Sequence, residues 1–538
     1  MRRLQVLAIL CLDPSSMART KYFQSFVNDL LVRDEEKMCK ILKFVPQNMF
    51  EILFNVAFRN NKTKLLYELV KTWPYSQLKF RKLLQACPFD SGTSSKRYLE
   101  DQWPLTYNES NKDRIDAIIL GVLGYIRKVI ICGSQQSPYR RLQQLDMTGL
   151  LGKDYFWNSK LMTLWATSIA RAKIYSKSLE KKTHYSESQA RNQEAEGFPV
   201  TTFPTEAHVE LLVDFHMSSS SEEFLKEALL DNTYSPLHLT CQDFYTSHSL
   251  VQSDLEILPL LDPLVLRRVD LSHSILILMD IRYLMSQITT FQNLQSLKLP
   301  HFNEDMQSGK HPMLKTNIDI LAEELSKLSH LREISLHSIC LSDQVEYLLR
   351  GLQCSLESLQ VSYCSLTNKD LTYLSQSHHS SQLIKLDLEG NNITELQGSF
   401  LELLKSVSNS LRWLNMTMCG ICVNDFCEIL PHLYSCSRLS YLGLSQNPLT
   451  RLSMCCFVGS CQNKLPNLKL ISVSIFLDCS KNLPQHGPLP RLSEDYLDND
   501  KFLSVLREME QIQISRGDSA IEFTTSLSFD KGDYFDLR

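Results

Sequence analysis

The sequence predicts an α/β solenoid of leucine-rich repeats, because one eleven-residue phrase recurs in register, its spacing is nearly constant, and amphipathic helices fit between the copies. Four full copies read LESLQVSYCSL, LIKLDLEGNNI, LRWLNMTMCGI and LSYLGLSQNPL, beginning at Leu356, Leu383, Leu411 and Leu439. Each has an aliphatic residue or Met at positions one, four, six and eleven, which is the pattern of this repeat. The periods of 27, 28 and 28 residues leave room for a strand and a helix in every repeat.

The order of residues within the phrase predicts a strand followed by a turn. Leu386 and Leu388 alternate with charged residues, so one face of the strand points into the core. Position nine is filled by Cys364, Asn391, Cys419 and Asn447. A buried Asn or Cys there can hydrogen-bond loop backbone that would otherwise be unpaired. Because no repeat buries its own apolar face, stacked repeats should form a horseshoe of the ribonuclease-inhibitor type, with a parallel sheet on its concave side.

The remaining sequence divides around this array. Residues 1–135 are expected to form a helical N-terminal region, since runs such as MFEILFNVAF repeat apolar residues at intervals of three and four. Residues 136–265 contain weaker copies, LQQLDMTGL, HVELLVDF and SPLHLTCQDF, and read as irregular early repeats. Within them, residues 172–198 have few apolar side chains and mixed charge, which indicates an exposed or disordered insertion.

The regular array is expected to span residues 266–479, beginning with LRRVDLSHSIL at Leu266 and closing with a partial phrase at Leu468. Solenoid ends expose apolar edges that need a cap with a polar outer face. Residues 480–538 break the pattern with a Pro-rich crossing, a helix and a strand, so we interpret them as the C-terminal cap.

Composition indicates a cytoplasmic protein without affinity for nucleic acid or membrane. The 538 residues carry a formal net charge of -4 and ordinary proportions of charged and hydrophobic side chains. The opening MRRLQVLAILCLDPSS imitates a secretory signal but ends at Asp13-Pro14 without a small-residue cleavage site, which favours a buried strand or helix. Several of the 16 cysteines fill repeat turns, which fits reduced thiols.

No catalytic, cofactor-binding or metal-binding motif stands out. The GxxxxGK[ST], GxSxG and HExxH patterns and paired CxxC motifs are absent from the sequence. The Cys455, Cys456 and Cys461 group and the His378-His379 pair lack the spacing of a zinc site, so helix packing and an exposed turn are the favoured interpretations. We therefore expect a protein that is not an enzyme and holds no metal or cofactor.

The expected partner-binding surface is the concave face, where parallel strands about 4.8 Å apart bring equivalent positions of successive repeats together. The residues expected to contact a partner are Arg268, Asp270, Gln360, Tyr363, Lys385, Asp387, Glu389, Trp413, Asn415 and Tyr441. An exposed Trp413 beside Tyr441 would have the composition of an interface hot spot. The alternative is that Trp413 packs on Lys385 or beneath the capping segment.

The sequence resembles the PRAME family. The resemblance rests on the N-terminal run that includes KTKLLYELVKTWP at Lys62, on the RRVDLS phrase, and on the array at similar spacing. Within the family, SPLHLTCQDF at Ser235 and the ending DYFDL at Asp533 match one branch most closely. The resemblance covers most of the chain, apart from the 172–198 insertion and parts of the N-terminus.

The resemblance implies a non-catalytic cytoplasmic interaction protein. One branch is associated with negative regulation of Toll-like-receptor signalling to NF-κB through binding of the IκB kinase beta subunit. Other members are associated with cullin-2 ubiquitin ligases as substrate receptors that dock elongins B and C through a short N-terminal helix. Our leading hypothesis is the signalling scaffold, and the ligase substrate receptor is the alternative.

The elongin-binding helix requires a Leu followed four residues later by a small residue. In this chain Leu31 is followed at that offset by Glu35, which breaks the pattern. The pairs Leu53 with Ala57 and Leu83 with Cys87 have the right spacing, but both lie in apolar helices where core packing is the simpler interpretation. The sequence therefore leaves ligase membership open.

Overall fold

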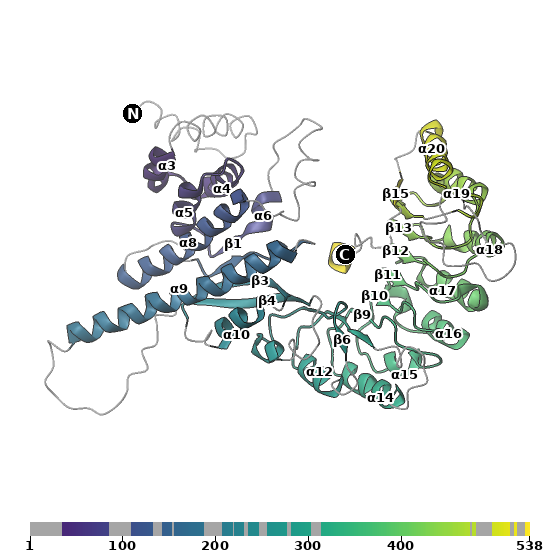
Figure 1. Cartoon of the computed structure of the whole chain (residues 1–538), viewed down its shortest axis with the longest axis horizontal. Helices are drawn as coiled ribbons and strands as arrows, with labels where there is room; N and C mark the ends of the chain where they lie inside the picture. The colour runs from purple at the N-terminus through teal and green to yellow at the C-terminus, as the bar shows by residue number, and fades with distance from the viewer. Residues whose placement is uncertain are drawn as a thin grey trace. The chain divides into compact units, whose positions relative to one another are not determined.

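The computed structural model describes residues 35–85, 109–132, 142–152, 155–187, 207–218, 220–230, 235–246, 256–276, 281–302, 314–473, 476–479, 498–516, 521–524 and 533–537. The chain forms two compact units, coloured along the sequence in Figure 1. Unit 1 comprises Met1–Tyr245 and Pro259–Val265, and unit 2 comprises Thr246–Leu258 and Leu266–Arg538.

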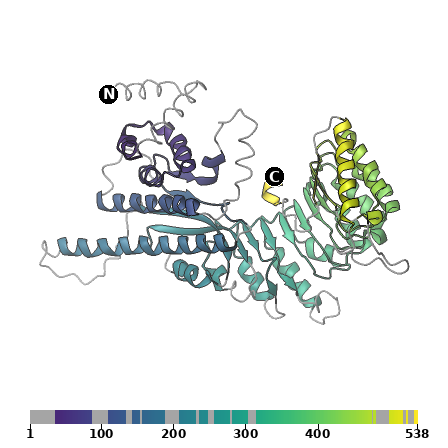
Figure 2. The same ribbon diagram turned by 45° about the horizontal axis from the view of Figure 1, so that its top comes forward.

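Unit 1 contains most of the N-terminal helices. They are α3 (Glu35–Ile41), α4 (Phe50–Arg59), α5 (Thr63–Lys71), α6 (Phe80–Gln85), α8 (Glu109–Cys132), α9 (Tyr155–Glu187) and α10 (Glu222–Leu230), with 3₁₀ turns η1 (Leu42–Phe44) and η2 (Gln47–Met49). The buried Phe54 ring meets Trp73 and Phe80 edge-on, with centroid distances of 5.9 and 6.2 Å. Helix α5 packs closely on α8, because a Cβ at Gly121 would lie 2.8 Å from Val70 Cβ. Figure 2 shows α8 running beside α9.

The strands of unit 1 are β1 (Gln77–Lys79), β2 (Gln144–Asp146), β3 (Val209–Met217) and β4 (Leu237–Thr246), which neighbour one another in that order. Strand β2 lies in the predicted LQQLDMTGL phrase, and β3 and β4 lie in HVELLVDF and SPLHLTCQDF, so these early phrases form strands as expected. Strand β1 was not expected, because the region was predicted to be helical. It pairs in parallel with β2 and contributes the buried Leu78.

Residues 172–187 of the expected insertion are helical, so the disordered alternative does not hold for them. Helix α9 continues through Glu187, and Ala172 and Ser176 are buried within unit 1. Mixed charge along one face of a helix resembles a solvated loop in composition, although the opposite face packs. Residues 188–198 lie outside the described residues, as do the opening sixteen residues with their signal-like run.

Unit 2 contains the regular array, with one strand for each phrase. Its strands are β5 (Arg268–Asp270), β7 (Ser296–Lys298), β9 (Glu333–Ser335), β10 (Ser358–Gln360), β11 (Lys385–Asp387), β12 (Trp413–Asn415), β13 (Tyr441–Gly443), β14 (Leu470–Ser472) and β15 (Glu522–Thr524). Neighbours in this order pair in parallel. Strands β6 (Ile275–Leu276) and β8 (His301–Phe302) form a separate parallel pair. This arrangement confirms the leucine-rich repeat solenoid.

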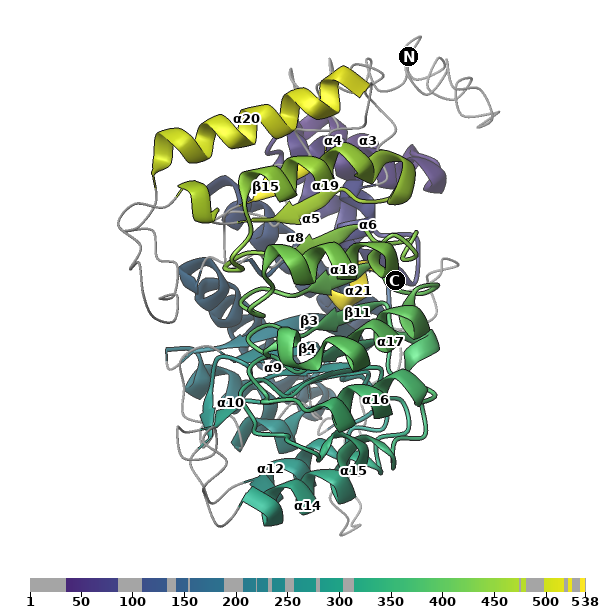
Figure 3. The same cartoon turned by 90° about the vertical axis from the view of Figure 1, so that its right-hand side faces the viewer.

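Helices follow the strands and cover the other side of the sheet (Figure 3). They are α12 (Ile281–Ile288), α14 (Leu314–Leu325), α15 (Val345–Leu349), α16 (Asn368–Gln376), α17 (Gln397–Val407), α18 (Val423–Leu433), α19 (Arg451–Lys464) and α20 (Asn499–Arg516), with 3₁₀ turns η7 (Ser380–Gln382), η8 (Ile393–Leu396) and η9 (Leu477–Cys479). A further 3₁₀ turn, η6 (Leu258–Leu260), precedes the array. Helix α16 begins with a capping box in which Thr367 and Asp370 each satisfy the other's backbone N–H.

The turn residues at position nine connect each repeat to its neighbours. Cys364, Asn391, Cys419 and Asn447 each donate a hydrogen bond to the position-six carbonyl of the preceding repeat. The asparagine side chains also accept hydrogen bonds. Asn447 Oδ1 accepts from the backbone N–H groups of Cys419 and Ile421, at 3.0 and 3.1 Å. The expected role of position nine, binding loop backbone, is therefore confirmed.

The helix and the strand expected in the C-terminal cap are present as α20 and β15. Helix α20 is followed by β15, which pairs with β14 in the same register as the strands before it, so the array gains a further strand. The expected Pro-rich crossing lies outside the described residues. The final helix, α21 (Tyr534–Leu537), packs against the strands, as described below.

Candidate protein-binding surface

The candidate surface is the strand face of unit 2, defined by the side chains at positions three and five of each phrase. In the strand register, position three gives the row Arg268, Ser296, Glu333, Ser358, Lys385, Trp413 and Tyr441. Position five gives the row Asp270, Lys298, Ser335, Gln360, Asp387, Asn415 and Gly443. The predicted neighbours Lys385, Trp413 and Tyr441 are thus adjacent, and the predicted register is confirmed.

The aromatic pair on this face is buried, which corrects the expectation of an exposed anchor. Trp413 and Tyr441 are 5% and 7% exposed, and their rings stack 4.6 Å apart at an interplanar angle of 8°. The Lys385 ammonium lies 4.6 Å from the centroid of the Trp413 ring, so the alternative in which Trp413 packs on Lys385 is correct. Burial raises the pKa of Tyr441 to about 12 and lowers the pKa of Lys385.

A polar cluster joins the turn residues to β11 and β12. The Tyr363 hydroxyl donates to Glu389 Oε1 at 2.8 Å, and Asn415 Nδ2 lies 3.0 Å from both Asp387 Oδ1 and Glu389 Oε2. Burial raises the pKa of both carboxyl groups, and the pKa of Glu389 is raised further by the nearby Asp387 charge. The four side chains were predicted as separate contact residues. The structure brings them into one network.

Charged side chains alternate on the earlier strands. Lys298 Nζ pairs with Asp270 Oδ2 at 2.9 Å. Burial alone would raise the pKa of Asp270, but attraction to Lys298 and hydrogen bonds outweigh it and lower the pKa to about 2. The fully buried Glu333 accepts hydrogen bonds from Ser296, Ser358 and Gln360. These strands therefore present several fixed charges within a small area.

The chain's own C-terminal residues, Asp533–Leu537, lie on this surface. Arg268 donates two hydrogen bonds to the Asp533 carboxylate, both at 2.6 Å. The Tyr534 hydroxyl donates to Glu357 Oε2 at 2.8 Å, and Arg412 Nη1 donates to the Leu537 carbonyl at 2.5 Å. Of the predicted residues, Arg268 thus contacts this segment and is itself only 2% exposed.

Sequence reasoning missed the residues at position two of the phrase, which lie one residue before each strand. Arg267, Arg332 and Arg412 all occupy it, and all three take part in contacts at or beside the C-terminal segment. The signal was present as LRR, LRE and LRW at the same register. The residues expected to contact a partner lie at positions three, five, seven and eight of the phrase.

Accessibility sorts the predicted residues into two groups. Gln360, Tyr363, Asp387 and Glu389 are partly exposed. Arg268, Asp270, Lys385, Trp413, Asn415 and Tyr441 are all buried, with exposed fractions of 7% or less. The first group can meet a partner directly in this conformation.

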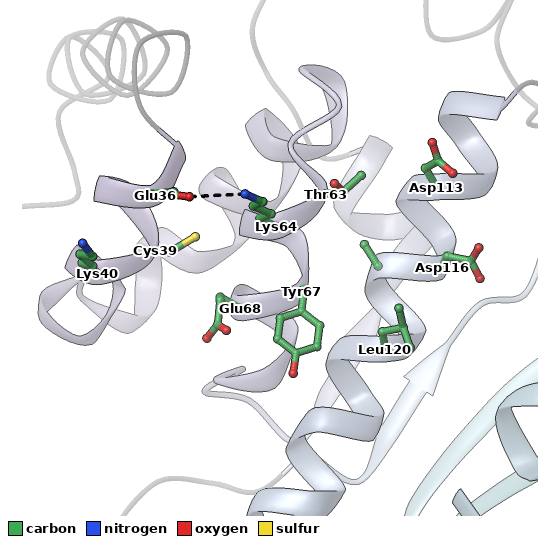
Figure 4. Close-up of a pocket in the computed structure, with 11 residues that line it drawn as sticks. Glu36, Cys39, Lys40, Thr63, Lys64, Tyr67, Glu68, Asp113, Asp116 and Leu120 are labelled. Atoms are coloured by element: carbon green, nitrogen blue, oxygen red, sulfur yellow. Dashed lines mark hydrogen bonds and ion pairs between the residues drawn. The ribbon is translucent and has the colours of Figure 1, made fainter. Parts of the chain in front are cut away.

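A pocket of about 730 Å³ lies in unit 1 between α3, α5 and α8 (Figure 4). Its lining includes Cys39, Tyr67, Asp116 and Leu120. Burial raises the pKa of Asp116 and of the Cys39 thiol, which keeps the thiol protonated. A mixed, partly charged lining of this kind supports no specific chemistry.

The N-terminal residues weighed for an elongin-binding helix have structural roles. Glu35 Oε1 accepts the backbone N–H of Leu65 at 2.9 Å, so its carboxylate caps the first turn of α5. Leu53 and Ala57 are fully buried, and Leu83 is 8% exposed. Leu31 and Cys87 lie outside the described residues.

Within the described ranges, no group of three or more His, Cys, Asp or Glu side chains is placed to hold a metal ion. The fully buried His379 accepts the Leu356 N–H at Nδ1. In the same part of the chain, none of the helices combines the length and apolar character needed to cross a membrane.

A parallel sheet with one strand for each repeat, helices behind it and a polar strand face in front define a leucine-rich-repeat interaction scaffold. The PRAME C-terminal domain model matches residues 209–472, and the PRAME N-terminal domain model matches residues 22–94. The chain is 32% identical to leucine-rich repeat-containing protein 14 of Xenopus laevis, over 92% of this chain and 96% of the relative. The Homo sapiens protein of that name is also 32% identical, over 93% and 96%. The chain belongs to the PRAME family.

Proposed function

We propose that this chain is a non-enzymatic cytoplasmic scaffold that binds the IκB kinase beta subunit on its strand face and so damps Toll-like-receptor signalling to NF-κB. The observation that carries the proposal is the strand face itself, where one side chain from each repeat lies in a continuous row. A rigid surface with hydrogen-bonding groups and aromatic rings fits recognition of a folded protein better than catalysis. The choice of partner follows the resemblance to the family.

The partly exposed Tyr363 and Glu389 are the first contacts that we assign to the partner. They are joined by a hydrogen bond of 2.8 Å and lie on neighbouring repeats. The Tyr363 ring presents an apolar body together with a polar tip, which suits an interface anchor. Glu389 adds a carboxylate for a basic group of the partner.

The test is binding of the purified full chain to the purified kinase subunit, measured by biolayer interferometry. The Tyr363→Ala, Glu389→Gln double variant should bind at least ten-fold more weakly, because it removes an aromatic anchor and a charge together. The matched control is Tyr283→Ala, since Tyr283 is 50% exposed on α12, on the helical side. Equal affinity of the double variant and the unaltered chain would contradict the proposal.

The same measurement separates the alternative, a substrate receptor of a cullin-2 ligase. Immobilised elongin B/C with cullin-2 is presented to the full chain in place of the kinase subunit. Capture of the chain by that complex, without affinity for the kinase subunit, would favour the alternative. The buried positions of Leu53 and Ala57 and the capping role of Glu35 support the scaffold over it.

A further inference from the structure

The C-terminal segment, Asp533–Leu537, contacts the array far from its own place in the sequence. Its partners are 265, 177 and 125 residues away, at Arg268, Glu357 and Arg412. Figures 1 and 3 show α21 against the strands. A single helical turn of this length has no stability of its own, so contacts with the array hold it in place.

The Asp533 carboxylate occupies a cationic site. The Arg268 guanidinium binds both of its oxygens, and Arg268 is 2% exposed. Lys298 and Lys385 lie near enough to attract the same carboxylate. Asp270 pairs with Lys298, and the buried Glu333 attracts both lysines, so Arg268 is the main cationic partner of the Asp533 carboxylate. A bidentate arginine pair is the geometry that selects a carboxylate.

The next two side chains are recognised as aromatic groups. Tyr534 is 1% exposed, and its hydroxyl donates to Glu357, which also pairs with Arg332. The Phe535 ring lies 4.2 Å from the Arg267 guanidinium and 4.6 Å from that of Arg268. The array therefore holds the phenol in a buried polar site and the second ring against two guanidinium groups.

These contacts are those of a receptor with a bound peptide. The side chains of the array supply charge, hydrogen bonds and cation–π contacts, whereas the solenoid core is built mainly from apolar side chains. The segment also presents the main-chain carbonyl of Leu537 to Arg412. Removal of the segment would leave the buried Arg268 without its carboxylate, which costs free energy unless another acidic group replaces it.

We propose that the strand face from β5 to β12 is a receptor site for a short segment of the pattern Asp-Tyr-Phe, which the chain's own C-terminus fills, and that a partner protein binds by presenting an acidic-aromatic segment in its place. The proposal rests on the proposed function for the existence of a partner, and it specifies the chemistry of the partner and the competition that controls access. Because the C-terminus is covalently attached, its effective concentration is on the order of 1 mM. Displacement thus requires a matching segment held close by further contacts.

The test uses a fluorescein-labelled synthetic peptide with the sequence of residues 532–538, GDYFDLR, and the full chain. In a release variant, Asp533→Lys and Tyr534→Ala are made together, so that the attached segment loses its two main contacts. Fluorescence anisotropy should show binding of the peptide to the release variant, and binding at least ten-fold weaker to the unaltered chain. A peptide with Lys in place of its Asp should not bind.

Two receptor variants in the release background locate the site. Arg268→Gln should abolish peptide binding, and because Arg268 is buried, thermal denaturation checks the fold of that variant. Arg412→Ala, at a partly exposed position, should weaken binding without that concern. Absence of binding to the release variant would overturn the receptor site. Equal binding to the release variant and the unaltered chain would overturn occupation by the attached segment.

Competition with the partner distinguishes this proposal from the proposed function. Excess GDYFDLR peptide should reduce binding of the kinase subunit to the release variant at least ten-fold. Kinase binding that withstands saturating peptide would overturn the recognition of an acidic-aromatic partner segment and leave the scaffold function intact. Peptide binding without any affinity for the kinase subunit would overturn the proposed partner and leave the receptor site standing.

Discussion

Replacement of Asn447 by Ala should destabilise the array far more than replacement of Cys419, although both residues occupy position nine and both are buried. Asn447 donates to Met416 and Leu444, and its Oδ1 accepts from the N–H groups of Cys419 and Ile421. The Cys419 thiol donates only weak hydrogen bonds, to the carbonyls of Leu388 and Thr417. The difference lies in the two backbone N–H groups that only an asparagine can satisfy.

The magnitude follows from these groups. A buried N–H that loses its acceptor costs about 1–3 kcal/mol, so Asn447→Ala should cost about 2–6 kcal/mol. Loss of one thiol donor in Cys419→Ala should cost about 1 kcal/mol. Asn391→Ala should fall between them, because Asn391 Oδ1 accepts one backbone N–H, that of Leu366.

Urea denaturation monitored by circular dichroism compares the three variants, and amide hydrogen exchange of Cys419 and Ile421 reports the local effect. Both amides should exchange faster in Asn447→Ala and keep their protection in Asn391→Ala. If Asn447→Ala were no more destabilising than Cys419→Ala, the accepting role of the asparagine would not contribute to stability, and the argument would fail.

Two further predictions concern pH and backbone geometry. Burial, and then the neighbouring His378, lower the pKa of His379 to about 4, below the ordinary value of 6.5. The folded chain therefore favours the neutral ring. The stability that this preference contributes is complete above pH 6.5 and is lost as the pH falls toward 4. The melting temperature should fall over that interval, and it should fall less in His379→Gln; equal slopes would contradict the assignment. Gly390 has φ of +71° and a Cβ there would overlap the Tyr363 ring, so Gly390→Ala should cost at least about 1–2 kcal/mol. Gly398→Ala, where a Cβ meets nothing within 4 Å, is the control that should leave the melting temperature unchanged or higher.

The repeat architecture and the strand register could be predicted from the sequence, because both follow from a local pattern that recurs in every repeat. Alternation at positions four and six sets which strand face is buried, and a one-residue slip would expose Leu386 and Leu388. The neighbours Lys385, Trp413 and Tyr441 followed from that register alone. Several copies of the phrase support the same register, so one irregular copy does not change the predicted fold.

Exposure on the strand face could not be predicted in the same way. The burial of Arg268 involves an acidic residue 265 positions away, and no periodic pattern connects Asp533 with Arg268. Strand β1 was missed because three residues between helices leave too short a run for alternation to be detected. The helix through residues 172–187 was not predicted, because this segment has few apolar residues and mixed charge.

The reactivity of the cysteines at position nine reports whether the repeats are folded. Burial raises the pKa of the Cys364 and Cys419 thiols, so neither supplies the thiolate that alkylating agents and oxidants attack. Cys427 and Cys456 are exposed on the outer helices and are open to such reagents in the folded chain. Modification of a turn cysteine thus records that a repeat has opened, and the order in which the thiols react with iodoacetamide maps where the solenoid unravels first.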